Sequence, residues 1–242
     1  MKRTKMRRMK GGGRVEGERP SPEGGAPTPV IDAARNAHEY QRISRFYDLL
    51  AAPRFTNGVR REAVARLRLR PGDSAMDLGC GTGLNIPMLV RAVGSSGRVV
   101  AVDLSPDQLK QTRERAGRLG LRNVSLVQAN AEELPLDEKF DGILSSYTHD
   151  IMTSPLAVER AAVHLKPGGR FVALGFCRPT GWRAPLNLLF MAFYRLFNIP
   201  INWDAETSDR PWSYLEAAVG RVKVERRFLG IWYRAVATKQ TA

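Results

Sequence analysis

Short apolar segments alternate with amphipathic segments across the middle of the chain, and this order constrains the fold more than any other feature. The pattern predicts strands over 74–78, 98–103, 124–128, 140–146 and 169–176. It predicts helices over 85–93, 106–119 and 156–165. Strands that alternate with helices form a mostly parallel sheet covered on both faces. The sequence therefore predicts a doubly wound α/β fold.

The two ends of the chain depart from this alternation. Residues 31–70 precede the first strand and contain apolar residues at helical spacing over 34–50 and 58–69. At the other end, 222–228 and 231–238 have the composition of strands and meet across Leu229 and Gly230. We therefore expect N-terminal helices, and an antiparallel hairpin that completes a seven-stranded sheet.

Residues 1–30 form a basic tail that is rich in Pro and Gly and has no apolar run. We expect this tail to be disordered, and neither a signal peptide nor a membrane anchor. The formal net charge of +14 favours anionic partners, or simply solubility. Cys80 and Cys177 are far apart and form no CxxC pair, which argues against a disulfide framework or zinc site. We expect one domain over 31–242 in the cytoplasm, with peripheral contact at a membrane as an option.

A glycine-rich turn follows the first expected strand, where residues 76–83 have the sequence Met-Asp-Leu-Gly-Cys-Gly-Thr-Gly. Glycines allow the backbone to turn sharply and to approach a ligand, and open α/β sheets bind ligands at this edge. A dinucleotide site would need Gly or Ala at position 84, where the chain has Leu84. The acid Asp77 suits a cationic ligand better than a pyrophosphate. Asp103 follows Gly83 at the distance expected of a ribose-binding acid.

This turn and three later segments, in the same order, resemble the class I S-adenosylmethionine-dependent methyltransferases. Residues 99–105 resemble the second strand, whose acid binds the ribose hydroxyls. Residues 128–135 resemble the adenine-binding segment, with Asn130 where the family usually has Asp. Residues 165–170 resemble the turn before the fifth strand. The resemblance covers roughly 46–239 and implies a Rossmann-like fold with S-adenosyl-L-methionine as cofactor.

The same resemblance implies a set of cofactor-binding residues around the glycine-rich turn and the next strand ends. These are Tyr47, Asp77, Gly79, Cys80, Gly81, Gly83, Asn85, Asp103, Leu104, Asn130, Ala131 and Ser145. Tyr47 matches the tyrosine of the family's N-terminal Tyr-Asp pair, which implies a role in closing the cofactor pocket.

Residues 43–50 and 228–239 resemble the corresponding segments of ubiquinone/menaquinone C-methyltransferases and of bacterial phospholipid N-methyltransferases. This resemblance bears on the acceptor. Quinone enzymes usually carry a Gly-Leu-Arg-Asn segment after the fourth strand. In this chain, residues 145–151 at that place have the sequence Ser-Ser-Tyr-Thr-His-Asp-Ile instead.

Methyl transfer mainly needs alignment of the acceptor and exclusion of water, and it needs a base only for a protonated acceptor. His149 is the candidate base, and Asp150 would orient it or bind a cationic acceptor. Alternatively, His149 caps the following helix.

Residues 185–200 form an apolar run between two prolines within an expected insertion over 178–212. A helix that is apolar on all sides is buried or faces lipid, and this one is shorter than the roughly 20 residues that span a bilayer. We expect a lid over an apolar acceptor, with a core or dimer-interface helix as the alternative. The candidate substrate-binding residues are Tyr40, Tyr147, Phe190 and Tyr194, with core packing as the alternative for Tyr40 and Tyr147.

These patterns predict an enzyme that methylates nitrogen, oxygen or carbon of a small apolar or lipid-like acceptor. The alternatives are a soluble secondary metabolite, a nucleic acid, or cofactor binding without catalysis. The sequence contains no base-flipping motif after the fourth strand and no recognisable RNA-binding module, which disfavours nucleic acid.

Overall fold

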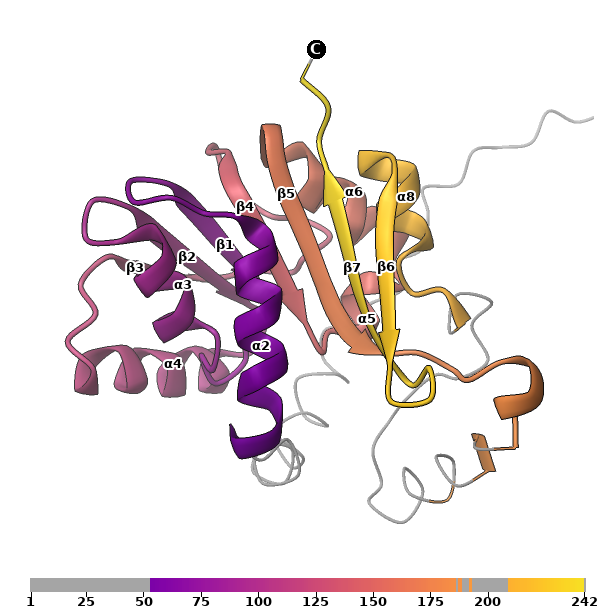
Figure 1. The fold of residues 1–242 in the computed structure, drawn as a ribbon. Coiled ribbons are helices and arrows are strands. Elements are labelled where there is room, and N and C mark those ends of the chain that lie inside the picture. The colour runs from indigo at the N-terminus through magenta and orange to yellow at the C-terminus, as the bar shows by residue number, and fades with distance from the viewer. Residues whose placement is uncertain (1–52, 186, 189–191, 193–208, 242) are drawn as a thin grey trace, which may run out of the picture.

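The computed structural model describes residues 53–185, 187–188, 192 and 209–241, whose fold is drawn in Figure 1. The elements in chain order are α2 (Pro53–Leu67), β1 (Ser74–Leu78), α3 (Ile86–Val93), β2 (Arg98–Asp103), α4 (Pro106–Arg118), β3 (Val124–Gln128), β4 (Phe140–Ser146), α5 (His149–Met152), α6 (Pro155–Val163), β5 (Leu165–Phe176), the 3-10 helix η1 (Gly181–Arg183), α8 (Ser213–Val219), β6 (Val222–Arg227) and β7 (Trp232–Thr238). The predicted tail, the 34–50 helix, most of the apolar run, Tyr40, Tyr47, Phe190 and Tyr194 lie outside these residues.

The strands form one seven-stranded sheet in the order β3-β2-β1-β4-β5-β7-β6. Strands β1 to β5 pair in parallel, whereas β7 is antiparallel to both β5 and β6. This confirms the predicted doubly wound sheet and its C-terminal hairpin. The order reverses between β1 and β4, and ligands of such sheets bind at the carboxyl ends of the strands beside this reversal.

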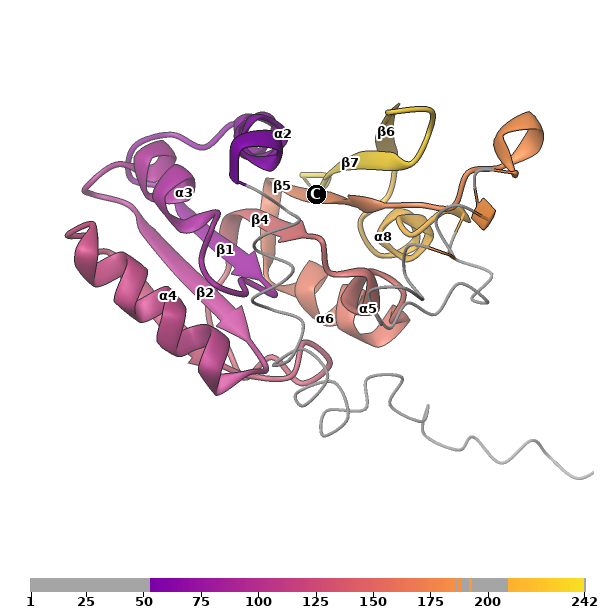
Figure 2. The same cartoon turned by 90° about the horizontal axis from the view of Figure 1, so that it is seen from below.

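Helices cover both faces of the sheet, as Figure 2 shows. Helices α2, α3 and α4 pack on one face with the cluster that contains Ala75, Val99 and Leu144. Helices α5, α6 and α8 pack on the other face with the cluster that contains Met76 and Ile143. Adjacent residues of β1 thus enter different clusters, because side chains alternate across a strand. Every residue of β1 is buried, as expected of a central parallel strand.

Several predicted boundaries were wrong. Helix α6 ends at Val163 rather than residue 165, and β5 begins at Leu165 rather than residue 169, because Leu165 already pairs with Phe140. Helix α2 runs over Pro53–Leu67 rather than 58–69, and it ends where Arg68 adopts a left-handed backbone (φ 55°). Residue 228, which was expected to continue β6, lies in the turn that follows the strand. Among the described residues, no helix has both the length and the apolar character needed to span a membrane.

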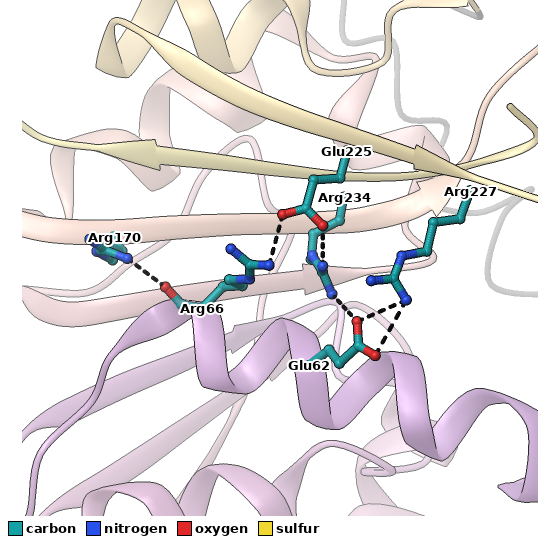
Figure 3. Close-up of polar contacts among 6 residues, drawn as sticks. All are labelled: Glu62, Arg66, Arg170, Glu225, Arg227 and Arg234. Atoms are coloured by element: carbon teal, nitrogen blue, oxygen red, sulfur yellow. Dashed lines mark hydrogen bonds and ion pairs between the residues drawn. The ribbon is translucent and has the colours of Figure 1, made fainter.

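Ion pairs hold α2 against the antiparallel end of the sheet (Figure 3). The Arg234 side chain on β7 is only 4% exposed, and it donates to Glu62 of α2 at 2.8 Å and to Glu225 of β6. Arg66 pairs with Glu225 at 2.8 Å, and Arg227 pairs with Glu62 at 3.2 Å. A buried arginine needs such partners, because an unpaired charge in the interior is costly. The pairs therefore fix the position of α2, which carries a residue of the site described below.

Candidate cofactor and acceptor site

The glycine-rich turn after β1 lies at the carboxyl edge of the sheet. Gly79, Gly81 and Gly83 have φ values of 69°, 55° and 76°, which favour glycine. A Cβ atom on Gly79 would overlap the methyl group of Thr148, and one on Gly83 would lie 2.8 Å from a threonine hydroxyl of α4. A Cβ on Gly81 would have its nearest neighbour at 4.0 Å. Gly79 and Gly83 thus pack against protein, whereas Gly81 has room beside it for a ligand.

Asp103 ends β2 directly beside this turn. Its carboxylate accepts hydrogen bonds from the backbone N–H of Gly81 at 2.8 Å and of Ser105 at 2.9 Å. A carboxylate has about four acceptor positions, so others remain for ligand hydroxyls. Nearby, the buried Oε1 of Gln108 lies close to Gly81 and has no hydrogen-bond partner within the described part of the chain. A ligand that supplies hydroxyl or amino donors fits these acceptors.

Asp77, Asp103 and Asp150 gather at this edge, and the pKa of each is raised. Burial raises the pKa of Asp77 to about 7, against the hydrogen bonds from Asn85 and the charge of Arg60, and repulsion from Asp103 adds to the rise. Burial also raises the pKa of Asp103, against its backbone hydrogen bonds. The pKa of Asp150 is raised by burial and further by Asp103. Because a nearby cation relieves such repulsion, the edge favours a positively charged ligand over a pyrophosphate.

A buried hydrogen-bond network supports Asp77. The Asn85 amide donates to both carboxylate oxygens of Asp77, at 2.9 and 3.2 Å. Arg60 of α2 donates to Asn85 Oδ1 and to Ser146 Oγ, each at 2.8 Å, and its guanidinium lies 4.8 Å from the ring centre of Tyr147. Charge-assisted hydrogen bonds of this kind are strong and directional. The network therefore connects α2, the start of α3 and the end of β4 to the acid beneath the glycine-rich turn.

Arg60 and Ser146 were missed by the sequence analysis. Arg60 carried a usable signal, since it precedes Ala63, Val64 and Leu67 at the spacing of one helix face, and those residues are buried. A charged residue at a core-facing position needs partners. Ser146 carried no such signal, because only the register of β4 decides which of two adjacent serines enters the network.

The remaining predicted cofactor residues take different positions. Cys80 is buried, which raises the pKa of its thiol far above the usual value, so the thiol stays neutral. Leu104 and Ala131 pack against the core. Asn130 Oδ1 accepts from the backbone N–H of Glu132 at 3.1 Å. Ser145 is fully buried.

The Ser145 hydroxyl lies within hydrogen-bonding distance of two neighbours, Leu78 O at 3.4 Å and Thr148 Oγ1 at 2.5 Å. These contacts join the end of β4 to the end of β1 and to the turn that follows β4.

The turn after β4 lies against the glycine-rich turn. Thr148 packs on Gly79, and Tyr147 has a left-handed backbone (φ 61°), a strained conformation for a bulky residue that often marks functional sites. Helix α5 then begins with His149 and Asp150, while Thr148 occupies the cap position. The structure thus brings the two candidate catalytic residues to the edge that carries Asp103.

Aromatic rings form a run from this edge toward the surface. Tyr147 lies 5.5 Å from Phe176 and 5.9 Å from Trp232, between ring centres. Phe176 and Trp232 are 5.3 Å apart, and Trp232 and Phe228 are 5.1 Å apart. Tyr147, Phe176 and Trp232 are half-buried. The carboxylate-rich edge is therefore bordered on one side by an apolar aromatic run.

Comparison with known proteins identifies the family. A family model described as a methyltransferase domain matches residues 75–169. The demethylmenaquinone methyltransferase of Anoxybacillus flavithermus is 33% identical over 166 residues, which cover 64% of this chain and 67% of that protein. The chain belongs to the class I S-adenosylmethionine-dependent methyltransferases. This family's cofactor is S-adenosylmethionine, whose positive sulfur suits the three carboxylates and whose ribose hydroxyls suit the free acceptor positions of Asp103.

Two further similarities bear on this methyltransferase. The ubiquinone/menaquinone biosynthesis C-methyltransferase UbiE of Cronobacter sakazakii is 38% identical over 128 residues, or 52% of this chain and 50% of that protein. A crystal structure of a SAM dependent methyltransferase from Aquifex aeolicus superimposes with a TM-score of 0.56 at 21% identity, covering 74% of this chain and 88% of that one. The chain thus spans about half the length of the Cronobacter relative, and the Aquifex structure shows that the fold is shared.

Proposed function

We propose that this chain transfers the methyl group of S-adenosylmethionine to a lipid-like apolar acceptor, with the ring of a reduced demethylated quinone as the first candidate. The observation that carries this proposal is the aromatic run of Tyr147, Phe176 and Trp232, which borders the edge that carries Asp103 and His149. Flat aromatic surfaces pack well against a ring system. The Anoxybacillus demethylmenaquinone methyltransferase and the Cronobacter ubiquinone/menaquinone C-methyltransferase, as relatives of this chain, support the same acceptor class.

On this proposal, the described residues hold the cofactor through three kinds of contact. Asp103 accepts hydrogen bonds from the ribose hydroxyls through its remaining acceptor positions. The open side of Gly81 allows the cofactor to approach the backbone. Asp77, held by Asn85 and Arg60, supplies negative charge toward the positive end of the cofactor. Asn130 retains a second acceptor position on its side-chain oxygen for the adenine amino group.

The protein's part in the reaction is to align the acceptor, to exclude water and to remove a proton. When bound, S-adenosylmethionine supplies a methyl group that is activated by positively charged sulfur. A carbon or hydroxyl acceptor must lose a proton when it gains the methyl group. His149 is our candidate for the base, because it is the first residue of α5, at the carboxyl edge of the sheet. Tyr147 and Phe176 would hold the apolar acceptor against the site.

The test incubates the protein and methyl-labelled S-adenosylmethionine separately with reduced demethylmenaquinone, phosphatidylethanolamine, RNA and a polar metabolite fraction. We expect label in the quinone. The control variant Asp103→Asn should lose most cofactor affinity by calorimetry and most incorporation. Label confined to RNA or to the polar fraction would overturn the lipid-like acceptor, and label in phosphatidylethanolamine alone would replace the quinone with an amino lipid.

A further inference from the structure

The turn between β6 and β7 is an exposed apolar tip formed by Phe228 and Leu229. The two residues are 63% and 57% exposed, and their φ values are 51° and 59°. Tight hairpin turns with positive φ favour Asn, Asp and Gly, because larger side chains are strained there by about 1–2 kcal/mol per residue. Neither turn geometry nor core packing therefore explains why this turn carries Phe and Leu.

This tip lies at the same edge of the sheet as the candidate site. Strand β6 is antiparallel to β7, which is antiparallel to β5, so β6 and β5 both end at the carboxyl edge. Figure 1 shows the β6–β7 turn at the end where β4 and β5 finish. Trp182 and Leu188, which follow β5, are also strongly exposed.

By contrast, the exposed Leu119 and Val163 lie at the C-terminal ends of α4 and α6, at the opposite edge. The exposed apolar side chains of the described residues thus gather mainly at the edge that carries the site.

Positively charged residues lie directly beside the tip. Arg226 and Arg227 end β6 directly before Phe228, and both are exposed. Arg226 donates to the backbone carbonyl of Asp209, while Arg227 pairs with the half-exposed Glu62, which is shared with Arg234. Two arginines therefore stand at the tip in a chain with a net charge of +14. Apolar side chains that project beyond basic ones are suited to an anionic lipid surface, where each Lys or Arg contributes about 1 kcal/mol.

The tip is also continuous with the aromatic run. Phe228 contacts Trp232, which contacts Phe176 and Tyr147 in turn. Tyr147 lies under the guanidinium of Arg60, whose hydrogen bonds lead to Asn85 and thus to Asp77. The rings connect an exposed apolar point of the surface with the polar network at the site.

We propose that Phe228 and Leu229, supported by Arg226 and Arg227, dock the protein onto an anionic lipid bilayer. In the docked orientation, the rings of Trp232, Phe176 and Tyr147, which lie behind the tip, form an apolar path along which a membrane-embedded acceptor reaches the site. The proposed docking surface is supported by the exposure of the tip and by the charge beside it, whereas the proposed acceptor path depends on the proposed function.

The test measures sedimentation of the purified chain with phosphatidylglycerol/phosphatidylcholine vesicles and with phosphatidylcholine vesicles alone. The double variant Phe228→Asn with Leu229→Gly removes the apolar tip and supplies residues that the turn geometry favours, so it should fold normally. We expect the wild type to bind the anionic vesicles, less so at high salt, and the variant to bind at least tenfold more weakly with unchanged cofactor affinity. Leu119→Asn, at the opposite edge, should bind like the wild type.

Equal vesicle binding by the double variant, or failure of the wild type to bind anionic vesicles, would overturn the docking surface. Light scattering that shows a wild-type dimer and a monomeric variant would assign the tip to self-association instead. A short-tailed, water-soluble demethylmenaquinone in reduced form separates the two proposals. The double variant should methylate this probe at the wild-type rate and methylate the vesicle-embedded quinone more slowly. Vesicle binding through the tip without any quinone methylation would leave docking intact and overturn only the proposed acceptor.

Discussion

Arg60 provides the sharpest test of the hydrogen-bond network at the site, because it is a charged residue on the face of helix α2 that otherwise packs apolar residues against the core. The residue is 6% exposed, and its side chain makes two hydrogen bonds of 2.8 Å, to Asn85 and to Ser146. The substitution Arg60→Met keeps the length of the side chain and removes its charge and its donors. We expect this variant to lose both stability and cofactor affinity.

The magnitude follows from the contacts. Hydrogen bonds from a charged donor are worth about 1.5–3 kcal/mol each, and the cation–π contact with Tyr147 adds about 1 kcal/mol. Burial of the methionine side chain recovers about 1.5–3 kcal/mol. The net loss is about 2–4 kcal/mol, and 1 kcal/mol shifts the melting temperature of a domain of this size by about 2–4 °C. The melting temperature should therefore fall by roughly 10 °C.

The effect on the cofactor has a separate cause. The charge of Arg60 lowers the pKa of Asp77, which burial raises to about 7. Without Arg60, this pKa rises further, Asp77 is protonated at pH 7.5, and a cationic ligand binds more weakly. Calorimetric unfolding and titration with S-adenosylmethionine measure the two losses.

Two control variants test whether the losses come from the charge of Arg60. Arg61→Met changes the exposed neighbour on the same helix and should alter neither quantity, while Arg60→Lys should fall between wild type and Arg60→Met. A melting temperature of Arg60→Met within about 2 °C of wild type would refute the energetic role assigned to the network.

Three other predictions concern the acid, the ion pairs and the glycines. Asp77 with a pKa of about 7 is mostly neutral at pH 5.5 and mostly charged at pH 7.5, so cofactor affinity should fall roughly tenfold on acidification, and Asp77→Asn should abolish this dependence in calorimetry. Glu225→Gln removes one carboxylate from the buried Arg234 and should cost about 2 kcal/mol in urea unfolding; an unchanged midpoint would show that the pair contributes nothing. Gly83→Ala should lower the melting temperature strongly, because its Cβ meets α4, whereas Gly81→Ala should unfold closer to wild type yet bind S-adenosylmethionine weakly; equal melting temperatures would contradict this assignment.

Local sequence patterns determined much of the fold. Each central strand is a short apolar run between turn residues, and helices α2, α3, α4 and α6 have their own apolar spacing, so these elements need no distant contacts to be recognised. The short helices α5 and α8 were not predicted. The glycine-rich turn was also predictable from local sequence, since the positive φ values at 79, 81 and 83 strongly favour glycine over residues with a side chain. Asp103 followed from its position at the end of a strand. The seven-stranded sheet and this part of the candidate site were therefore available from sequence.

Boundaries were less predictable, because they depend on pairing. Leu165 has the side chain of a helix residue, but its backbone pairs with Phe140 and so begins a strand. In the same way, only the register of β4 against its neighbours turns Ser145 into the interior and Ser146 toward Arg60. A shift of one residue would exchange these roles, since successive side chains of a strand point to opposite faces.

The tertiary structure alone decided which distant residues meet. Arg60 reaches Ser146 across 86 positions of the chain, because α2 packs across β4 and β5 on one face of the sheet. Tyr147 meets Trp232 because β7 inserts antiparallel beside β5. Local propensity carries no information about strand order, which is settled by burial of the whole set of elements together. The sequence by itself therefore determined the strands, the longer helices of the alternating pattern and the glycine-rich turn, whereas the polar network and the aromatic run exist only in the assembled sheet.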